Sequence, residues 1–208
     1  LMTKIRYFLL LVVLSMPLWS ADPLITQELI EKVGHKYDTF AKNRFIAIKE
    51  DLLETLQTKD DLSKLNFVNT WVNFIRYKSD EQLYNVEDYW ATLYEFVAKN
   101  GGDCEDYTIA KYYILKELGV DPNKMKFVYV IYQGRNGKKT PHMVLAYLKV
   151  PQPKLKEDVL ILDNNNRLVL PASKRPDLIK IIKMINGDTG PKSKKWKQLE
   201  LDMKRKKL

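Results

Sequence analysis

Residues 101–113 read Gly-Gly-Asp-Cys-Glu-Asp-Tyr-Thr-Ile-Ala-Lys-Tyr-Tyr, a glycine turn that runs into a helical pattern. After Cys104, apolar residues recur at the i, i+3, i+4 spacing of a helix with one buried face. These residues are Ile109, Ala110, Tyr113, Ile114 and Leu118. Gly119, followed by Pro122, stops the pattern. We therefore predict a helix of about four turns that begins at Cys104.

Cys104 is the only cysteine of the chain, which excludes an internal disulfide. The free N–H groups at a helix start lower the pKa of a thiol and so favour the nucleophilic thiolate. The neighbouring carboxylates oppose this, because negative charge raises the pKa of a thiol. A hard cation held by Asp103, Glu105 and Asp106 would remove the conflict. The stretch thus indicates a cysteine nucleophile beside a calcium site.

The same residues also fit a purely structural role. Asp103 and Asp106 have the spacing of an acidic capping box, and acidic residues are common in the first turn of a helix. Cys104 would then be a buried structural thiol. This stretch by itself does not separate the two interpretations.

The first twenty residues have the order of a secretory signal peptide. Lys4 and Arg6 precede an apolar run over residues 7–14, and Ser20-Ala21 supplies small residues for cleavage. The run is short for a transmembrane helix, although Trp19 makes the cleavage site imperfect and leaves retention as an anchor open. We expect a signal peptide at residues 1–20, a single domain at residues 21–208 and export to the periplasm.

The net charge of +9 is concentrated at the C-terminal end. Residues 192–208 hold eight basic and two acidic residues, whereas the body of the chain is close to neutral. This distribution argues against nucleic-acid binding. The basic segment, which we expect to be helical, favours an acidic partner or an anionic lipid surface, or is simply a solvated helix end.

The rest of the chain predicts an α+β domain with helices first and an antiparallel sheet after. Helical patterns occupy residues 22–57, with a break near Gly34, a segment from Asp61, and residues 86–98, with a loop over 78–85. Phe40, Phe67 and Phe74 fall among the residues expected to be buried. From residue 127 onward the period changes to that of strands. The predicted strands are Phe127–Tyr132, His142–Val150, Val159–Leu162, Leu168–Leu170 and Ile179–Ile185.

A cysteine nucleophile needs a base and a group that orients the base. Of the two histidines, His35 lies near a helix break and is expected at the surface, whereas His142 begins a strand. Asp163 ends the next strand, and adjacent antiparallel strands bring such ends together. We expect His142 to lie opposite residues 164–166, near Asp163, where a helix packed on the sheet would present Cys104 to it. Alternatively, His142 is only a hydrogen-bonded strand residue and Asp163 starts a turn.

Several short motifs together resemble the bacterial transglutaminase-like cysteine proteinases, and among them the LapG-type periplasmic adhesin proteases. The resemblance covers roughly residues 40–200, with the order Cys, His, Asp that the family requires. Leu93 stands where proline is expected, and residues 177–185 fit only loosely. The motifs are Tyr89-Trp90-Ala91-Thr92, Gly-Asp-Cys-Glu-Asp-Tyr at 102–107, Ile109-Ala110-Lys111-Tyr112, Pro141-His142-Met143-Val144-Leu145 and Leu162-Asp163-Asn164.

The resemblance implies a papain/transglutaminase-like fold and a calcium-dependent endopeptidase. It implies that the enzyme cleaves the N-terminal region of a large surface adhesin near paired alanines, which releases the adhesin and promotes biofilm dispersal. It also implies an inner-membrane cyclic di-GMP receptor that sequesters the protease as an inhibitor. The matching triad residues are Cys104, His142 and Asp163, and the matching calcium ligands are Asp103, Glu105 and Asp106.

Two other functions fit the same residues. The first is a transglutaminase-type acyl transferase, because a triad does not specify whether water or an amine accepts the acyl group. The second is a non-enzymatic, exported calcium-binding module in which the acidic turn holds the ion structurally.

Overall fold

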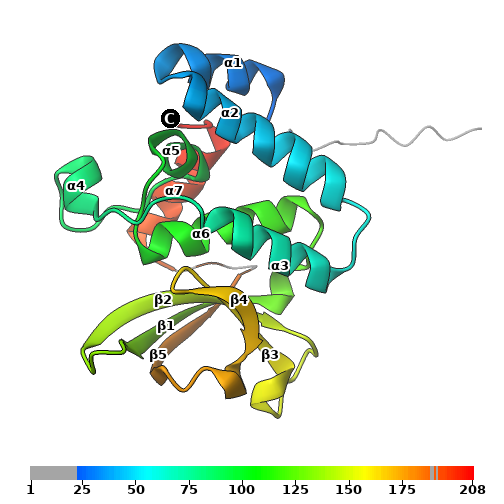
Figure 1. The fold of residues 1–208 in the computed structure, drawn as a ribbon, viewed down its shortest axis with the longest axis vertical. Coiled ribbons are helices and arrows are strands. Elements are labelled where there is room, and N and C mark those ends of the chain that lie inside the picture. The colour runs from blue at the N-terminus through cyan, green and yellow to red at the C-terminus, as the bar shows by residue number, and fades with distance from the viewer. Residues whose placement is uncertain (1–22, 188–189, 191) are drawn as a thin grey trace, which may run out of the picture.

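The computed structural model describes residues 23–187, 190 and 192–208. The predicted signal peptide, residues 1–20, lies outside the described residues. In the described part the helices gather on one face of a single five-stranded sheet, and α6 lies directly against that sheet (Figure 1). No helix among the described residues has the length and apolar character needed to cross a membrane.

Side-chain caps start most of the helices. Thr26, Asp38, Asp60, Ser79 and Thr92 each accept a backbone N–H of the first turn that has no partner within the helix. A π-helical segment, Ile48–Glu54, extends α2. The α-helices are α1 (Gln27–Lys36), α2 (Thr39–Ala47), α3 (Asp61–Val72), α4 (Asp80–Tyr84), α5 (Leu93–Lys99), α6 (Cys104–Glu117) and α7 (Lys194–Lys204).

The strands form an antiparallel sheet in the order β4-β3-β2-β1-β5. Gly137, with φ of 78°, provides the left-handed conformation in the turn between β1 and β2. Short 3-10 helices occupy Pro122–Lys124, Lys156–Asp158 and Ala172–Lys174. The strands are β1 (Met125–Gln133), β2 (Lys139–Leu148), β3 (Val159–Asp163), β4 (Asn166–Pro171) and β5 (Leu178–Asn186).

The two faces of the sheet bury different residues. Met143, Leu145 and Leu162 belong to the main core beneath the helices, whereas Val130 and Val144 belong to a smaller cluster on the other face. This alternation is the expected consequence of successive strand side chains pointing to opposite faces. The predicted α+β arrangement, with the Cys104 helix packed on an antiparallel sheet, is therefore confirmed.

Three predictions about the helical half were wrong. Residues 78–85 contain the short helix α4, which a capping box at Ser79 stabilises, and are not a simple loop. Residues 86–92 are not helical, because the capping box of Thr92 and Glu95 starts α5 only at Leu93. The third error concerns burial. Phe40, Phe67 and Phe74 are 76%, 60% and 73% exposed.

The exposure of Phe67 follows from the orientation of α3. Its contacts with α6 and β4 bury Leu65, Val68 and Val72, which leaves Phe67 on the opposite side. Because almost every turn of this helix carries apolar residues, the sequence pattern does not reveal which side faces the core.

Gly102 fits into a confined space just before α6. Its backbone N–H donates to Arg76 O and its carbonyl accepts from Lys78 N at 3.0 Å. A Cβ at this position would lie 2.6 Å from Oδ2 of Asp106 and 2.6 Å from Cδ2 of Phe96. The loop before Cys104 can therefore take this path only with glycine.

We predict that Gly102→Ala lowers the free energy of unfolding by about 1–3 kcal/mol, because the added methyl group forces neighbouring atoms apart. Urea unfolding measures this change. Gly34→Ala within α1 is the control, because its Cβ would meet only the flexible side chain of Lys42. The control should be neutral or stabilising by up to about 1 kcal/mol. Equal stability of the Gly102 variant and the wild type would contradict the prediction.

Lys111 is a buried basic residue on α6. It is 1% exposed, and burial lowers its pKa to about 7, although the charge of Asp163 opposes the shift. The pKa of a lysine in the unfolded chain is about 10.4. Between these two pH values the unfolded chain keeps a proton that the folded protein releases, so stability should rise with pH across this window.

We predict that Lys111→Met removes this rise and stabilises the protein at pH 6 by about 1–4 kcal/mol, because no charge has to be buried. Denaturant unfolding at pH 6 and pH 9.5 measures both effects. Lys116→Met, at an exposed position of the same helix, should leave the pH dependence unchanged. A destabilised Lys111 variant that keeps the wild-type pH dependence would refute the prediction.

Candidate active site

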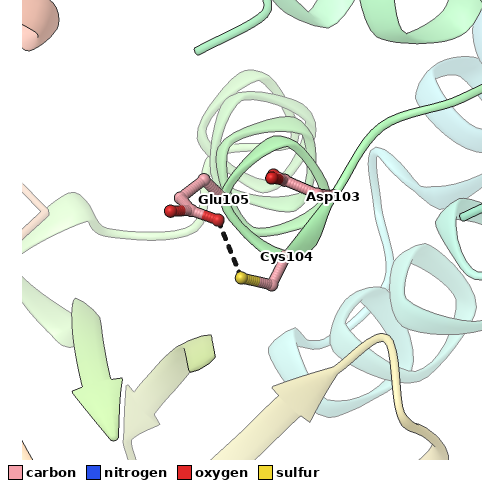
Figure 2. Close-up of side chains that lie close together, drawn as sticks. All are labelled: Asp103, Cys104 and Glu105. Atoms are coloured by element: carbon pink, nitrogen blue, oxygen red, sulfur yellow. Dashed lines mark hydrogen bonds between the residues drawn. The ribbon is translucent and has the colours of Figure 1, made fainter. Parts of the chain in front are cut away.

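Cys104 is the first residue of α6, and Asp103 is its N-cap. The backbone N–H of Asp103 donates to Oδ2 of Asp106 at 3.3 Å, which gives one half of the predicted capping box. The thiol of Cys104 donates to Oε2 of Glu105 at 2.7 Å. Figure 2 shows these two side chains turned toward each other, with the Asp103 carboxylate on a different side.

Burial raises the pKa of the Cys104 thiol, and the negative charge of Glu105 and its hydrogen bond raise the pKa further. Asp103 acts in the same direction, whereas the backbone N–H of Met143 lowers the pKa. The thiol is therefore protonated in this arrangement. Met143, whose backbone N–H acts on the thiol, is the residue of strand β2 that follows His142.

Thr108 joins the start of α6 to β2. Its hydroxyl oxygen Oγ1 lies 2.8 Å from the carbonyl oxygen of Cys104 and 3.2 Å from the carbonyl oxygen of Met143. Because Met143 follows His142, this contact brings the first turn of the helix to the strand that carries the predicted base. The preceding residue, Tyr107, donates its hydroxyl to the carbonyl of Ile75 and so also anchors the start of α6.

His142, the fourth residue of β2, and Asp163, the last residue of β3, form a buried pair. Nε2 of His142 lies 2.7 Å from Oδ1 of Asp163, and both residues are less than 10% exposed. The register pairs Leu145 with Leu162, and Nδ2 of Asn165 lies 3.5 Å from the histidine ring. His142 thus lies beside residues 163–165, as the strand geometry predicts.

Asp163 is surrounded by donors that no sequence pattern pointed to. Nη2 of Arg175 contacts Oδ2 at 2.5 Å, and the N–H of Asn165 donates to Oδ1 at 2.9 Å. Burial raises the pKa of Asp163, but the hydrogen bonds and charges of His142 and Arg175 outweigh burial and hold the pKa below its usual range. The carboxylate is therefore ionised.

Two asparagines of α3 fix the backbone around Asp163. Oδ1 of Asn69 accepts the N–H of Asp163 at 3.2 Å, and Nδ2 of Asn73 donates to its carbonyl at 2.8 Å. The sequence holds only a weak signal for them, because Asn69 and Asn73 lie next to the apolar residues Val68 and Val72 on the buried side of the helix. Buried amides of this kind need specific partners.

A cluster of carboxylates lies on the other side of the α6 N-terminus. One oxygen each from Asp80, Asp103 and Asp106 lie within 4.8 Å of one another. Oδ1 of Asp80 and Oδ1 of Asp103 are buried and have no hydrogen-bond partner in the described part of the chain. Such orphaned oxygens in an all-oxygen donor set suit a hard divalent cation.

The carboxylates of this cluster raise one another's pKa. Burial, and after it the negative charges of Glu105 and Asp80, together raise the pKa of Asp103 to about 8. Burial likewise raises the pKa of Asp106, followed by the charge of Asp103. The first turn of α6 therefore concentrates more negative charge than it can neutralise by itself.

The cluster differs in composition from the predicted ligand set. The structure brings Asp103 and Asp106 together with Asp80, which was expected in a loop and was not predicted as a ligand. Glu105 groups with Asp103 and Cys104 instead. Asp80 could not be found from the sequence, because it lies more than twenty residues before α6 and only the chain path brings it near.

Comparison with known proteins adds to this geometry. Residues 36–202 match the family model described as bacterial transglutaminase-like cysteine proteinase. The chain has no match among curated proteins. Among solved structures it is similar to Legionella pneumophila LapG, with 33% identity and a TM-score of 0.69 over 89% of this chain and 99% of that chain.

Two further Legionella pneumophila LapG structures are similar. The calcium-bound form shares 30% identity, with a TM-score of 0.65 over 85% of this chain and 98% of that chain. The EGTA-treated form shares 31% identity, with a TM-score of 0.67 over 89% and 100%. These matches confirm that the fold is transglutaminase-like. Because the family model spans most of the chain, including Cys104, His142 and Asp163, the chain belongs to the bacterial transglutaminase-like cysteine proteinases.

Proposed function

We propose that this chain is a calcium-dependent cysteine endopeptidase with Cys104, His142 and Asp163 as its catalytic triad. The observation that carries the proposal is the position of Cys104 at the start of α6, which Thr108 holds against the strand residue following His142. The buried pair of His142 and Asp163 completes the site. Membership of a cysteine proteinase family supports the same activity.

The proposed reaction is acyl transfer to water. Sγ of Cys104 gives its proton to His142 and attacks the carbonyl carbon of the peptide bond. The C–N bond then breaks, the leaving amine takes the proton from His142, and a thioester remains on Cys104. Water gives a proton to His142 and attacks the thioester, which releases the carboxylate product. The proton returns to the sulfur.

The histidine nitrogens take different roles in this reaction. An ionised Asp163 can only accept hydrogen bonds, so Nε2 of His142, 2.7 Å away, carries the proton. Nδ1 is then the nitrogen left to accept the proton of the thiol. The backbone N–H of Cys104 lies in the first turn of α6, where N–H groups have no acceptor within the helix. It can therefore donate to the oxyanion that forms on the substrate.

We infer that Asp80, Asp103 and Asp106 hold a calcium ion, with Glu105 as a neighbouring carboxylate. The unpartnered oxygens of Asp80 and Asp103 support this inference, as does the calcium-bound form of the similar Legionella pneumophila LapG. When bound, calcium supplies positive charge that offsets the carboxylates beside the thiol.

For the substrate we propose a large surface adhesin, cleaved in its N-terminal region so that it leaves the cell and the biofilm disperses. For regulation we propose sequestration by an inner-membrane cyclic di-GMP receptor, and for the compartment the periplasm. The motif resemblance to LapG-type proteases, the 33% identity to Legionella pneumophila LapG and the signal-like order of residues 1–20 support these proposals. Cell fractionation tests the compartment, and recovery of the protein only from the cytoplasm would contradict it.

We predict that the purified protein cuts the N-terminal region of the host's largest surface adhesin into discrete fragments on a gel. Cys104→Ala and His142→Ala should lower the rate at least about a thousandfold, because each removes a member of the triad. His35→Ala, at the other and exposed histidine, should leave the rate unchanged. Adding the periplasmic domain of the receptor to the same reaction should inhibit cleavage.

The outcomes of this reaction separate the rival functions. Incorporation of a labelled amine without chain cleavage would indicate a transglutaminase-type transferase. Full biological activity of the Cys104→Ala protein would show that the thiol performs no chemistry, and the calcium-binding module would then be the better account. Uninhibited cleavage in the presence of the receptor domain would remove the receptor from the proposal.

We predict that calcium at about 100 times its Kd stabilises the protein by about 2.7 kcal/mol, which corresponds to a Tm increase of about 5–10 °C. Thermal unfolding with calcium or chelator measures the shift, and calorimetric titration measures affinity. Asp80→Asn should weaken calcium binding at least about tenfold, because it removes a charged ligand. Asp51→Asn, at an exposed acidic residue, is the control. The same Tm in calcium and in chelator would refute calcium binding.

A further inference from the structure

Arg175 follows the 3-10 helix Ala172–Lys174 and lies in the interior at 3% exposure. Its Nη2 contacts Oδ2 of Asp163 at 2.5 Å and Oδ2 of Asp177 at 2.7 Å. Its Nε also donates to Oδ1 of Asp177 at 2.9 Å. Asp177 thus binds the planar guanidinium through two nitrogens and orients it toward Asp163.

We propose that Arg175 is a positioning residue for the proposed hydrolysis: it keeps Asp163 ionised and oriented so that His142 holds a single tautomer. The proposal rests on the proposed function, in which His142 is the base. It adds a fourth member to the chain of contacts from Cys104 to the interior. Arg175 acts only through Asp163, because within the described part of the chain its side chain forms hydrogen bonds with the carboxylates of Asp163 and Asp177 alone.

The hydrogen bonds at Asp163 show why a cation is needed. Oδ1 accepts from Asn165 and faces Nε2 of His142, which leaves Oδ2 for Arg175. The Asp163 side chain has no exposed surface, so water does not reach it. Without Arg175, Oδ2 would be a buried carboxylate oxygen with no partner, which favours the protonated form.

Protonation of Asp163 would disturb His142. An ionised carboxylate accepts only, so it requires the proton of the ring on Nε2. A neutral carboxyl group can either accept from Nε2 or donate to it, so the ring is free to adopt the wrong tautomer. A neutral Asp163 also stabilises the positive charge that forms on the His142 ring during proton transfer less well than an ionised one.

The charged groups facing Asp163 come from several elements. His142 approaches from β2, Arg175 from the segment after β4, and Lys111 from α6. The α3 side chains that reach this residue, Asn69 and Asn73, are neutral and contact only its backbone. Arg175 is the cation in direct contact with the carboxylate, so its loss removes more stabilisation of the ionised form than loss of Lys111 would.

The test is the variant Arg175→Met, which keeps an unbranched, largely apolar side chain but removes the forked guanidinium and its charge. We expect kcat to fall about tenfold to a hundredfold at pH 6 with little change in KM, less than the roughly 10⁴-fold loss expected when the wrong tautomer is enforced. The deficit should shrink as pH rises, because Asp163 then regains its charge. In the wild type, protonation of Asp163 should cause no loss of kcat between pH 8 and pH 6.

Nitrogen-15 NMR of labelled histidine provides a readout that needs no substrate. The chain has two histidines, so His35→Ala assigns both ring systems. We expect His142 to be a single tautomer protonated at Nε2 in the wild type and a mixture in Arg175→Met. If the wild type cleaves no adhesin, the proposed function fails, whereas this measurement still tests the arrangement around Asp163.

Three further variants complete the design. Arg175→Lys keeps the charge without the fork and should give an intermediate kcat and tautomer mixture, and it decides the matter if Arg175→Met does not fold. Asp177→Asn loosens the clamp while leaving Arg175 beside Asp163, so its effect should be smaller. Arg135→Met, in the exposed hairpin, is the matched control and should behave as wild type.

One result would overturn the proposal. If the folded Arg175 variants lose stability but keep the wild-type pH profile and a single His142 tautomer, Arg175 stabilises the fold and does not position the site.

Discussion

The contact between the first turn of α6 and strand β2 is the constraint on which the site depends. Thr108 bridges the carbonyls of Cys104 and Met143, and so holds the residue that carries the thiol beside the residue that follows His142. A helix packed elsewhere on the sheet would keep the same core but separate the thiol from the imidazole. The confined glycine before the helix serves the same end, because Gly102 lets the loop pass between Asp106 and Phe96.

Two opposite electrostatic environments meet at this contact. On the helix side, buried carboxylates crowd together and raise each other's pKa, which is why the arrangement calls for a cation. On the sheet side, Asp163 is already provided with a cation and with hydrogen-bond donors, and it stays ionised although it is buried. The pKa values on the two sides differ because of the neighbouring groups and not because of burial, since the carboxylates on both sides are removed from water.

The side chains that hold Asp163 in place come from two other regions of the chain, the segment after β4 and the C-terminal part of α3. Arg175 contacts its carboxylate, whereas Asn69 and Asn73 contact its backbone. These contacts pair the carboxylate, the backbone N–H and the carbonyl of Asp163, which would be costly to bury without hydrogen-bond partners. This shared dependence explains why a residue without direct access to the reacting atoms can still govern the chemistry in our proposal.

Local patterns in the amino-acid sequence are enough to predict the helix that begins at Cys104, the strands that carry His142 and Asp163, and the close approach of those two residues. These follow from local rules: a turn before a periodic apolar pattern, and a connection whose length sets the register between adjacent strands. The same local rules could not tell which side of α3 faces the core, because apolar residues occur all around it. Phe67 was therefore wrongly predicted to be buried.

The packing of the whole chain, in contrast, brings Asp80 to Asp103 and Asp106, turns Glu105 toward the thiol and places Arg175 beside Asp163. Each of these contacts depends on where distant segments pack or on which of several rotamers a side chain adopts. No periodicity or spacing in the chain records such choices, because they are settled by the shape of the folded core and by the need to pair every buried charge.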